Sequence, residues 1–407
     1  MESNVMRNCL NALVLLTTLA PLSSIYAQSL VEEEVIEHAL SESSLRDLTN
    51  LSRQAALLAA EAAVPPANPE LEYSRETLDG PVTDTEESFV WIRQRLDLAG
   101  VNSRLRDAAA LDAAARMAEL DLIQGDRIAT IRRHLYRHLS AKERLDHLTD
   151  SMENMSQLID SASMRVAAGD LSEYDLIWLQ REYDDIQLKI TEAAATLNSE
   201  AATLISLAQL EPEASFDGDV LPPDPAAMSS SELLNNQPDL QLVERQFEAA
   251  QKRQEAASRQ RWPSLTVGLG ERRANEGAFR SEGNLFSLTV EVPLFGTGKR
   301  NLAAAQAHAS SLAAERAMVN REVSAEIARL QAVVDNQRTI AVRQYQRSQK
   351  QQLAELARAA YLAGEVSVNQ LLDAERSDLE LRLGAADAAL EARETFIEWQ
   401  TLTGALP

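Results

Sequence analysis

Two five-residue stretches, Ala168-Gly169-Asp170-Leu171-Ser172 and Ala363-Gly364-Glu365-Val366-Ser367, state one pattern at positions 195 residues apart. Each follows a long stretch that is rich in alanine and leucine and free of proline, and each precedes another of similar character. Glycine adopts the left-handed conformation that commonly ends a helix. The pattern predicts two helical hairpins, with Gly169 and Gly364 at their tips, produced by an internal duplication.

The stretches around these tips predict very long helices. Residues 300–363 contain no proline or glycine, and apolar residues recur there every three or four positions. A continuous helix of that length would extend about 95 Å. Residues 103–168 are the counterpart in the first repeat, and residues 171–210 and 366–402 are expected to return as antiparallel helices. A further helix is expected to open each repeat, at 30–63 and 231–260.

Between the opening helix and the long helix, each repeat changes to the two-residue period of a strand. Residues 285–293 alternate strictly, with Phe286, Leu288, Val290 and Val292 on one face. Residues 265–270 alternate similarly, and the turn-rich segment 273–284 joins the two strands. The first repeat has a fainter hairpin at 71–78 and 89–96 around an acidic turn, because Arg93 and Arg95 interrupt its pattern.

These elements divide the chain into four parts. Residues 1–27 have the basic start, the apolar run and the small residue before cleavage that are typical of an export signal. Residues 28–212 form the first repeat, residues 213–230 a proline-rich linker, and residues 231–407 the second repeat.

The export signal also contains the only cysteine, Cys9, which lacks the small and apolar neighbours of a lipid attachment site. The mature protein therefore has no disulfide. No apolar run of about 18 residues follows residue 27, so we expect strands rather than helices in any membrane-crossing part.

Composition and motifs argue against several functional classes. The net charge of -23 is opposite to the basic footprint that nucleic-acid binding requires. His134 and His138 stand at the i, i+4 spacing of two metal ligands, but no third ligand has a diagnostic position, and surface histidines are the better interpretation. No nucleophile, base and orienting acid can be placed together by motif. We expect neither an enzyme, nor a cofactor, nor a bound metal.

Three short motifs in the second repeat resemble the TolC-type outer-membrane efflux family. The first is Val292-Pro293-Leu294-Phe295 with Gly298-Lys299-Arg300, and the second runs from Tyr361 through Ser367 to Leu371-Leu372-Asp373-Ala374. The third is the closing Leu402-Thr403-Gly404. The order of elements agrees with that family over essentially the whole mature chain.

The resemblance implies a mainly α-helical fold with a pair of membrane β-hairpins. Three copies would pool four strands each into a 12-stranded outer-membrane β-barrel, and their helices would form a periplasmic α-helical tunnel. The protein would be a passive exit channel in contact with outer-membrane lipid. Its partners would be a periplasmic adaptor and an inner-membrane pump of the resistance-nodulation-division type.

The resemblance also assigns candidate sites. The tunnel mouth in drug-exporting relatives is narrowed by aspartates at positions that match Gln370 and Asp373, of which only Asp373 keeps a carboxylate. Asp175 holds the equivalent place in the first repeat and could complete an acidic ring. The alternative is that both aspartates are solvated helix-surface residues.

The hairpin tips and two tryptophans complete the candidate sites. The residues that would meet the adaptor are Gly169, Asp170, Gly364 and Glu365. Trp91 and Trp262 are candidates for the aromatic girdles at the lipid interface, and simple packing at the base of the barrel is the alternative for Trp262.

Within this family, the compact N-terminus without a lipid cysteine and the Ala-Gly-Glu-Val-Ser sequence of the second tip favour the heavy-metal branch, which is of the cobalt-zinc-cadmium type. A drug or organic-solvent channel of the same family is the first alternative. The alternative from another class is an exported coiled-coil scaffold or adaptor, which would have no reason to carry the apolar alternation of residues 286–292.

Overall fold

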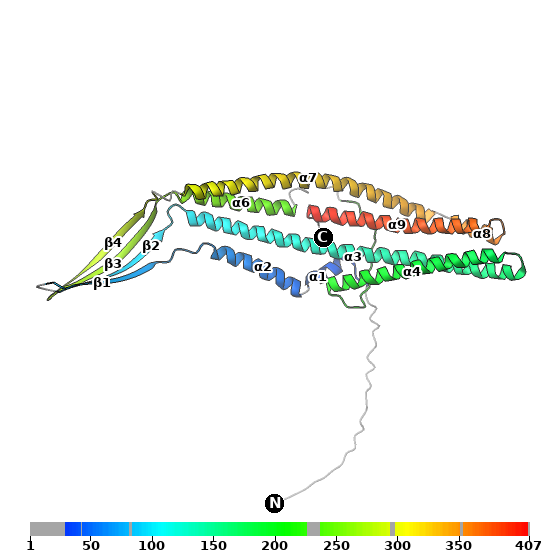
Figure 1. The fold of residues 1–407 in the computed structure, drawn as a ribbon, viewed down its shortest axis with the longest axis horizontal. Helices are drawn as coiled ribbons and strands as arrows, with labels where there is room; N and C mark the ends of the chain where they lie inside the picture. Colours follow the sequence, from blue (N-terminus) through cyan, green and yellow to red (C-terminus); the bar gives the residue numbers. More distant parts are fainter. Residues whose placement is uncertain are drawn as a thin grey trace, which may run out of the picture.

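The computed structural model describes residues 29–41, 43–80, 84–225, 237–293, 298–350 and 353–405. The predicted signal at 1–27, the end of the predicted linker and Leu294-Phe295 lie outside the described residues. The chain forms an elongated molecule with a sheet at one end and two helical tips at the other (Figure 1).

The first repeat consists of four helices and two strands. Helices α1 (Glu32–Ser41) and α2 (Ser43–Ala62) precede strands β1 (Glu70–Leu78) and β2 (Thr85–Leu96). Helix α3 (Val101–Ala168) follows, and its 68 residues extend about 100 Å. Helix α4 (Glu173–Ala208) returns beside it.

The second repeat has the same order. Helix α6 (Pro238–Arg259) leads to strands β3 (Ser264–Glu276) and β4 (Phe279–Glu291). Helices α7 (Lys299–Lys350) and α8 (Leu353–Leu362) occupy the stretch predicted as one helix, with residues 351–352 outside the described part. Helix α9 (Val368–Thr403) returns along them.

The four strands form one antiparallel sheet in the order β1-β2-β3-β4, with β1 and β4 at its two edges. We expected the segment 273–284 to be mostly turn, and this expectation was wrong. Strands β3 and β4 remain paired up to Glu276 and Phe279. A two-residue turn suffices because Gly277 adopts a φ of 57°. The polar sequence concealed these strands because backbone hydrogen bonds, rather than an apolar face, hold them together.

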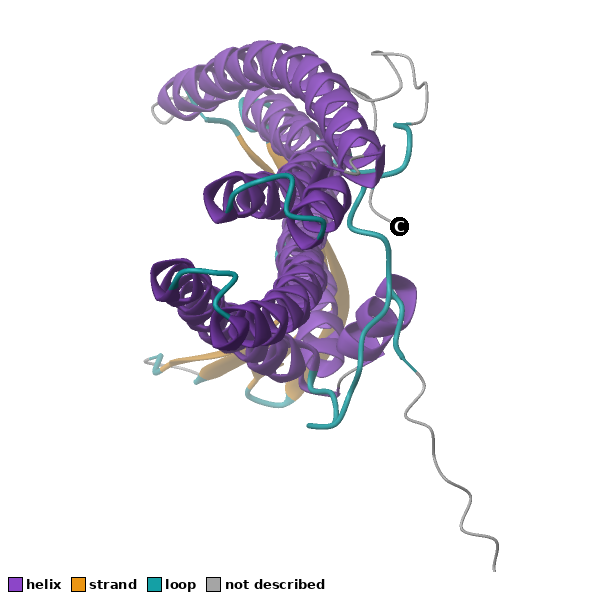
Figure 2. Ribbon diagram, turned by 90° about the vertical axis from the view of Figure 1, so that its right-hand side faces the viewer, coloured by secondary structure: helices purple, strands orange, loops and turns teal. Residues whose placement is uncertain are grey.

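The helices are arranged in an arc that is open on one side (Figure 2). Helix α3 lies at the centre of this arc, in contact with α2, α4, α6 and α9. Alanines occupy many of its buried positions, such as Ala108, Ala113 and Ala129, and small side chains let helix backbones approach closely. Because α3 of the first repeat packs on α6 and α9 of the second, the two repeats form one body.

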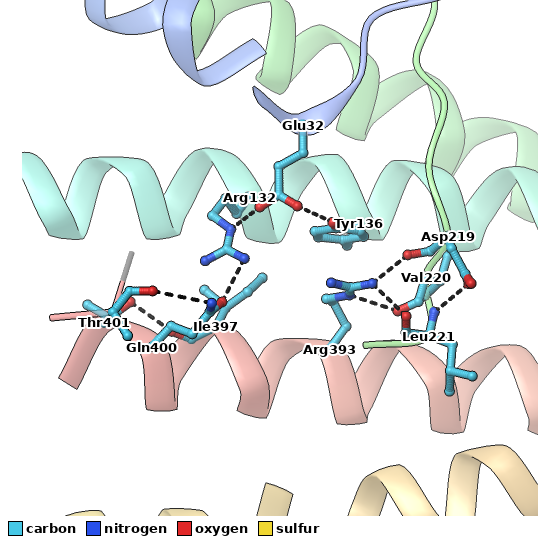
Figure 3. A network of polar contacts seen from close by, with 11 residues as sticks. Glu32, Arg132, Tyr136, Asp219, Val220, Leu221, Arg393, Ile397, Gln400 and Thr401 are labelled. Carbon is cyan, nitrogen blue, oxygen red and sulfur yellow. Dashed lines mark hydrogen bonds and ion pairs between the residues drawn. The ribbon is translucent and has the colours of Figure 1, made fainter. Parts of the chain in front are cut away.

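A polar network halfway along the molecule joins the repeats (Figure 3). The Glu32 carboxylate of α1 accepts hydrogen bonds from Arg132 and Tyr136 of α3. Arg132 Nη2 also donates to Gln400 Oε1 of α9, at 2.8 Å. The first helix after the predicted signal is thereby connected to both repeats.

Arg393 of α9 holds the segment that crosses the helices between the repeats. Its Nε donates to the carbonyl oxygen of Val220 at 2.9 Å, and its Nη2 donates to those of Asp219 and Leu221 at 2.6 Å (Figure 3). Its guanidinium lies over the Tyr136 ring, 4.2 Å from the ring centre. Residues 219–221 of the predicted linker are therefore fastened across the helices.

Candidate functional site at the tips and the sheet

Both hairpin tips have the conformation that the repeated motif predicted. Gly169 and Gly364 end α3 and α8 in the left-handed region, with φ of 82° and 78°. In each tip the next residue, Asp170 or Glu365, donates its backbone N–H to the carbonyl five residues back, at 2.8 Å. This is the Schellman arrangement, which glycine accommodates without strain. The tip residues are exposed.

The return helices begin with matching serine caps. Ser172 Oγ accepts from the backbone N–H of Tyr174 at 3.1 Å, and Ser367 Oγ accepts from that of Gln370 at 3.4 Å. Gln370 Oε1 also accepts from the backbone N–H of Ser367 at 2.9 Å, which completes a capping box. Gln370 thus has a structural task at the helix start.

A shared apolar cluster holds the two tips together. This tip cluster consists of the buried residues Met155, Leu158, Ala162, Leu179, Ile186, Tyr361, Val368, Leu371 and Leu372. It contains side chains from α3, α4, α8 and α9. Arg165 reinforces it, because its Nη1 donates to the carbonyl oxygen of Tyr361 at 3.2 Å and its guanidinium lies over the Tyr361 ring.

The candidate constriction residues lie close to this cluster. Asp175 is half-buried in the first turn of α4. Burial of the Tyr361 side chain raises the pKa of Tyr361; the nearby charge of Arg165 opposes this shift, and the charge of Asp175 adds to it. Gln370 and Asp373 are exposed on α9. The negative charge of Asp373 helps to raise the pKa of Arg376, whose main cause is the hydrogen bond to Glu182. Within one chain the three candidates belong to two different helices.

A layer of ion pairs beside the tip cluster, in which the glutamates are buried, was not predicted. Glu375 of α9 pairs with Arg358 of α8 at 2.7 Å, and Arg358 Nη1 donates to Asn154 of α3 at 2.8 Å. Burial raises the pKa of Glu375, while Arg358 opposes this effect. Glu182 of α4 is buried against Arg376 of α9.

The two histidines with ligand-like spacing have protein partners. His134 Nδ1 lies 2.7 Å from Glu200 Oε2, and His138 Nδ1 lies 3.4 Å from the carbonyl oxygen of Leu197. Burial lowers the pKa of His138. Within the described parts of the chain, no three histidine, cysteine, aspartate or glutamate side chains gather as a metal site would require.

The sheet has two chemically different faces. The strand register places Leu71, Ile92, Leu269 and Phe286 side by side across all four strands, and these residues are 50–78% exposed. The apolar face continues with Tyr73, Val90, Val267, Leu288, Leu265 and Val290. The opposite face is mostly polar. None of the helices in the described ranges combines the length and the apolar character needed to cross a membrane.

The two candidate interface tryptophans differ in position. Trp262 is 69% exposed at the junction of α6 and β3. Trp91 pairs with Glu72 and Gly270 in the register, so it lies on the polar face, opposite to the apolar one. The blurred alternation of the first hairpin did not reveal this orientation.

Comparison with known proteins agrees with this architecture. No protein-family model matches the chain. It is 26% identical over 326 residues to the cobalt-zinc-cadmium resistance protein CzcC of Cupriavidus metallidurans, with 78% of this chain and 76% of that protein covered.

Solved structures with the same fold include membrane channels. The chain matches CusC, for which transmembrane channel formation is described, with a TM-score of 0.74, 20% identity and 91% of both chains covered. It matches the outer membrane protein VceC of Vibrio cholerae with a TM-score of 0.72 and 16% identity, over 92% of this chain and 96% of that one. The resemblance to TolC-type channels and the predicted mainly helical fold with a small sheet are confirmed.

Proposed function

We propose that three copies of this chain form the outer-membrane exit channel of a tripartite efflux system for heavy-metal cations. The observation that carries the channel is the two-faced sheet on a chain with the fold of outer-membrane channels. The apolar face that contains Leu71, Leu269 and Phe286 is exposed in a single copy, and an exposed apolar surface of this kind indicates a contact with another molecule. Because its apolar residues form a belt across all four strands, the hydrocarbon of a membrane is the contact that suits it.

The edges of the sheet support assembly into a closed ring of strands. Strands β1 and β4 leave one side of their backbones unpaired in a single copy. Because neighbouring strands alternate in direction, β4 of one copy would run antiparallel to β1 of the next, and three copies would close a ring of 12 strands. Closure satisfies every backbone group in lipid. The helical arcs would then enclose a periplasmic tunnel, in continuity with this ring.

The opposite end of the molecule suits the partners of such a system. The exposed tips at Gly169, Asp170, Gly364 and Glu365 lie farthest from the sheet (Figure 1), where a periplasmic adaptor would meet them. An inner-membrane pump of the resistance-nodulation-division type would supply the energy. The channel itself would perform no chemistry, because transport through an open conduit requires only a continuous passage.

The carboxylates near the tips would act on cations. Asp175 and Asp373, repeated in three copies, would form an acidic ring. The ring would raise the local cation concentration, and its carboxylates would repel one another. Gln370 contributes a neutral side chain that is engaged in its helix cap. The metal cargo is supported by the similarity to a cobalt-zinc-cadmium resistance protein.

Growth of a deletion strain tests this function. The strain is compared, with and without the restored gene, on gradients of zinc, cobalt, cadmium, nickel and copper salts and on a panel of antibiotics and detergents. We expect selective metal sensitivity that the restored gene relieves. Sensitivity to the organic panel alone would replace the metal cargo with drugs or solvents.

A further inference from the structure

The apolar face of the sheet ends in a belt of charged side chains. In the part of each strand that lies farther from the helices, the residues on this face change from leucine, valine and phenylalanine to mostly arginine, glutamate and small polar residues. The charged belt consists of Arg75, Glu86, Glu271, Arg273, Arg280 and Glu282. Its side chains are 39–65% exposed.

The members of the charged belt pair with one another in a single copy. Arg75 Nη2 lies 2.7 Å from Glu86 Oε1, and Arg273 Nε lies 2.8 Å from Glu271 Oε1. Arg280 is paired with a glutamate of β4 in the same way. Exposed ion pairs contribute little to stability. A guanidinium of this belt can therefore exchange its carboxylate for another anion at little cost.

The spacing along β4 places the charged belt at the edge of a hydrocarbon layer. Val290 and Arg280 share the apolar side of the sheet and stand ten residues apart, which is about 34 Å along a strand. A strand tilt of about 40° reduces this to about 26 Å along the membrane normal, close to the apolar band of about 25 Å in outer-membrane barrels. Tyr73, which is 64% exposed, stands between Leu71 and Arg75 on the same face, as an interfacial aromatic residue would.

The type of basic residue also indicates what this belt would contact. Every basic residue of the four strands is an arginine. The planar guanidinium donates two parallel hydrogen bonds to a phosphate and is more weakly hydrated than the ammonium of lysine. Arginine is therefore the residue that suits a phosphate at the border of an apolar layer.

We propose that the charged belt binds the anionic phosphate groups of lipid headgroups in the outer leaflet of the membrane. The proposal rests on the proposed function, because the apolar face must meet lipid for this belt to reach headgroups. A phosphate would replace a glutamate on Arg75, Arg273 or Arg280, and the released carboxylate would turn to water. Three copies would repeat the belt around the ring, and the bound headgroups would fix the height of the strands in the membrane.

Lipid binding to the detergent-solubilised trimer, measured by native mass spectrometry, tests the proposal. The probe is lipid A, a glycolipid with two phosphate monoesters, and it is compared with dephosphorylated lipid A. R273Q/R280Q should weaken lipid A binding by about fivefold for each guanidinium removed. The matched control is R272Q, because Arg272 is the next residue along β3, lies on the opposite face and is paired with Glu87. R272Q should bind lipid A as the wild type does.

The outcomes separate the proposal from the proposed function. A wild-type protein that forms no trimer, and that salt alone releases from membranes, refutes the proposed function itself. A trimer that binds lipid A and its dephosphorylated form equally overturns the present proposal alone. This comparison uses the wild type, so it carries the test even where R273Q/R280Q does not assemble.

Two further outcomes would also overturn the proposal. Equal losses of lipid A binding in R272Q and R273Q/R280Q would show that the face of the sheet does not matter. Displacement of lipid A by inorganic phosphate at equal concentration would show that the arginines bind a free anion instead of a headgroup. We expect neither, because the acyl chains of the lipid lie against the apolar residues beside the belt.

Discussion

Replacing Arg393 with methionine should loosen the junction between the two repeats. Arg393 is 5% exposed and donates to three backbone carbonyls of residues 219–221 through two of its nitrogens. A hydrogen bond from a charged donor contributes about 1.5 kcal/mol, so losing all three should lower the free energy of unfolding by about 4.5 kcal/mol. Burial lowers the pKa of Arg393, which reflects the cost of keeping this cation inside.

The matched control is R144M. Arg144 also connects α3 to α9, through Asp387 at 3.0 Å, but the two side chains are 42% and 62% exposed. Such a pair contributes less than about 1 kcal/mol. The assays are denaturant unfolding of the detergent-solubilised protein and limited proteolysis of the crossing segment at 211–225. Equal unfolding midpoints and cleavage rates for R393M and R144M would refute the reasoning.

Three further predictions concern the tips. L371A should destabilise the protein by about 3 kcal/mol, because Leu371 is fully buried in the tip cluster; a shift below about 1 kcal/mol in denaturant unfolding would mean that the cluster collapses around the gap. Glu375 has a pKa raised above its ordinary 4.5, so its contribution to stability is present below that pH and is lost as the pH rises through the raised value. E375Q should remove this pH dependence from the unfolding free energy, and an unchanged profile would assign it to other groups. D175A/D373A should weaken cation preference and divalent block in planar bilayers, and unchanged selectivity would exclude the acidic ring.

The sequence predicts the long elements of this protein well. The stretch without proline before Gly169 gives α3 to within two residues at its start, because Gly100 and Gly169 mark its two ends. The Ala-Gly-Glu-Val-Ser motif predicts the second tip because glycine and serine have specific roles in ending and starting helices. These signals are local, so one chain is enough to recognise them.

The features that sequence reasoning missed depend on contacts between distant segments. Glu182 and Arg376 are 194 residues apart, and no local pattern indicates that they pair between α4 and α9. The face on which Trp91 lies follows from its pairing with Gly270, which only the strand register reveals. The contact of Arg393 with residues 219–221 could not be predicted either, because it depends on how α9 packs against the first repeat.

Planar-bilayer recording of the purified mature protein tests the central claim most directly. The protein is extracted with detergent from the membrane fraction, isolated as a trimer and added to a lipid bilayer. The account predicts stepwise single-channel currents from a trimer that salt or carbonate alone does not release from membranes. A protein that salt or carbonate does release, and that gives no currents, would be an exported coiled-coil scaffold instead of a channel.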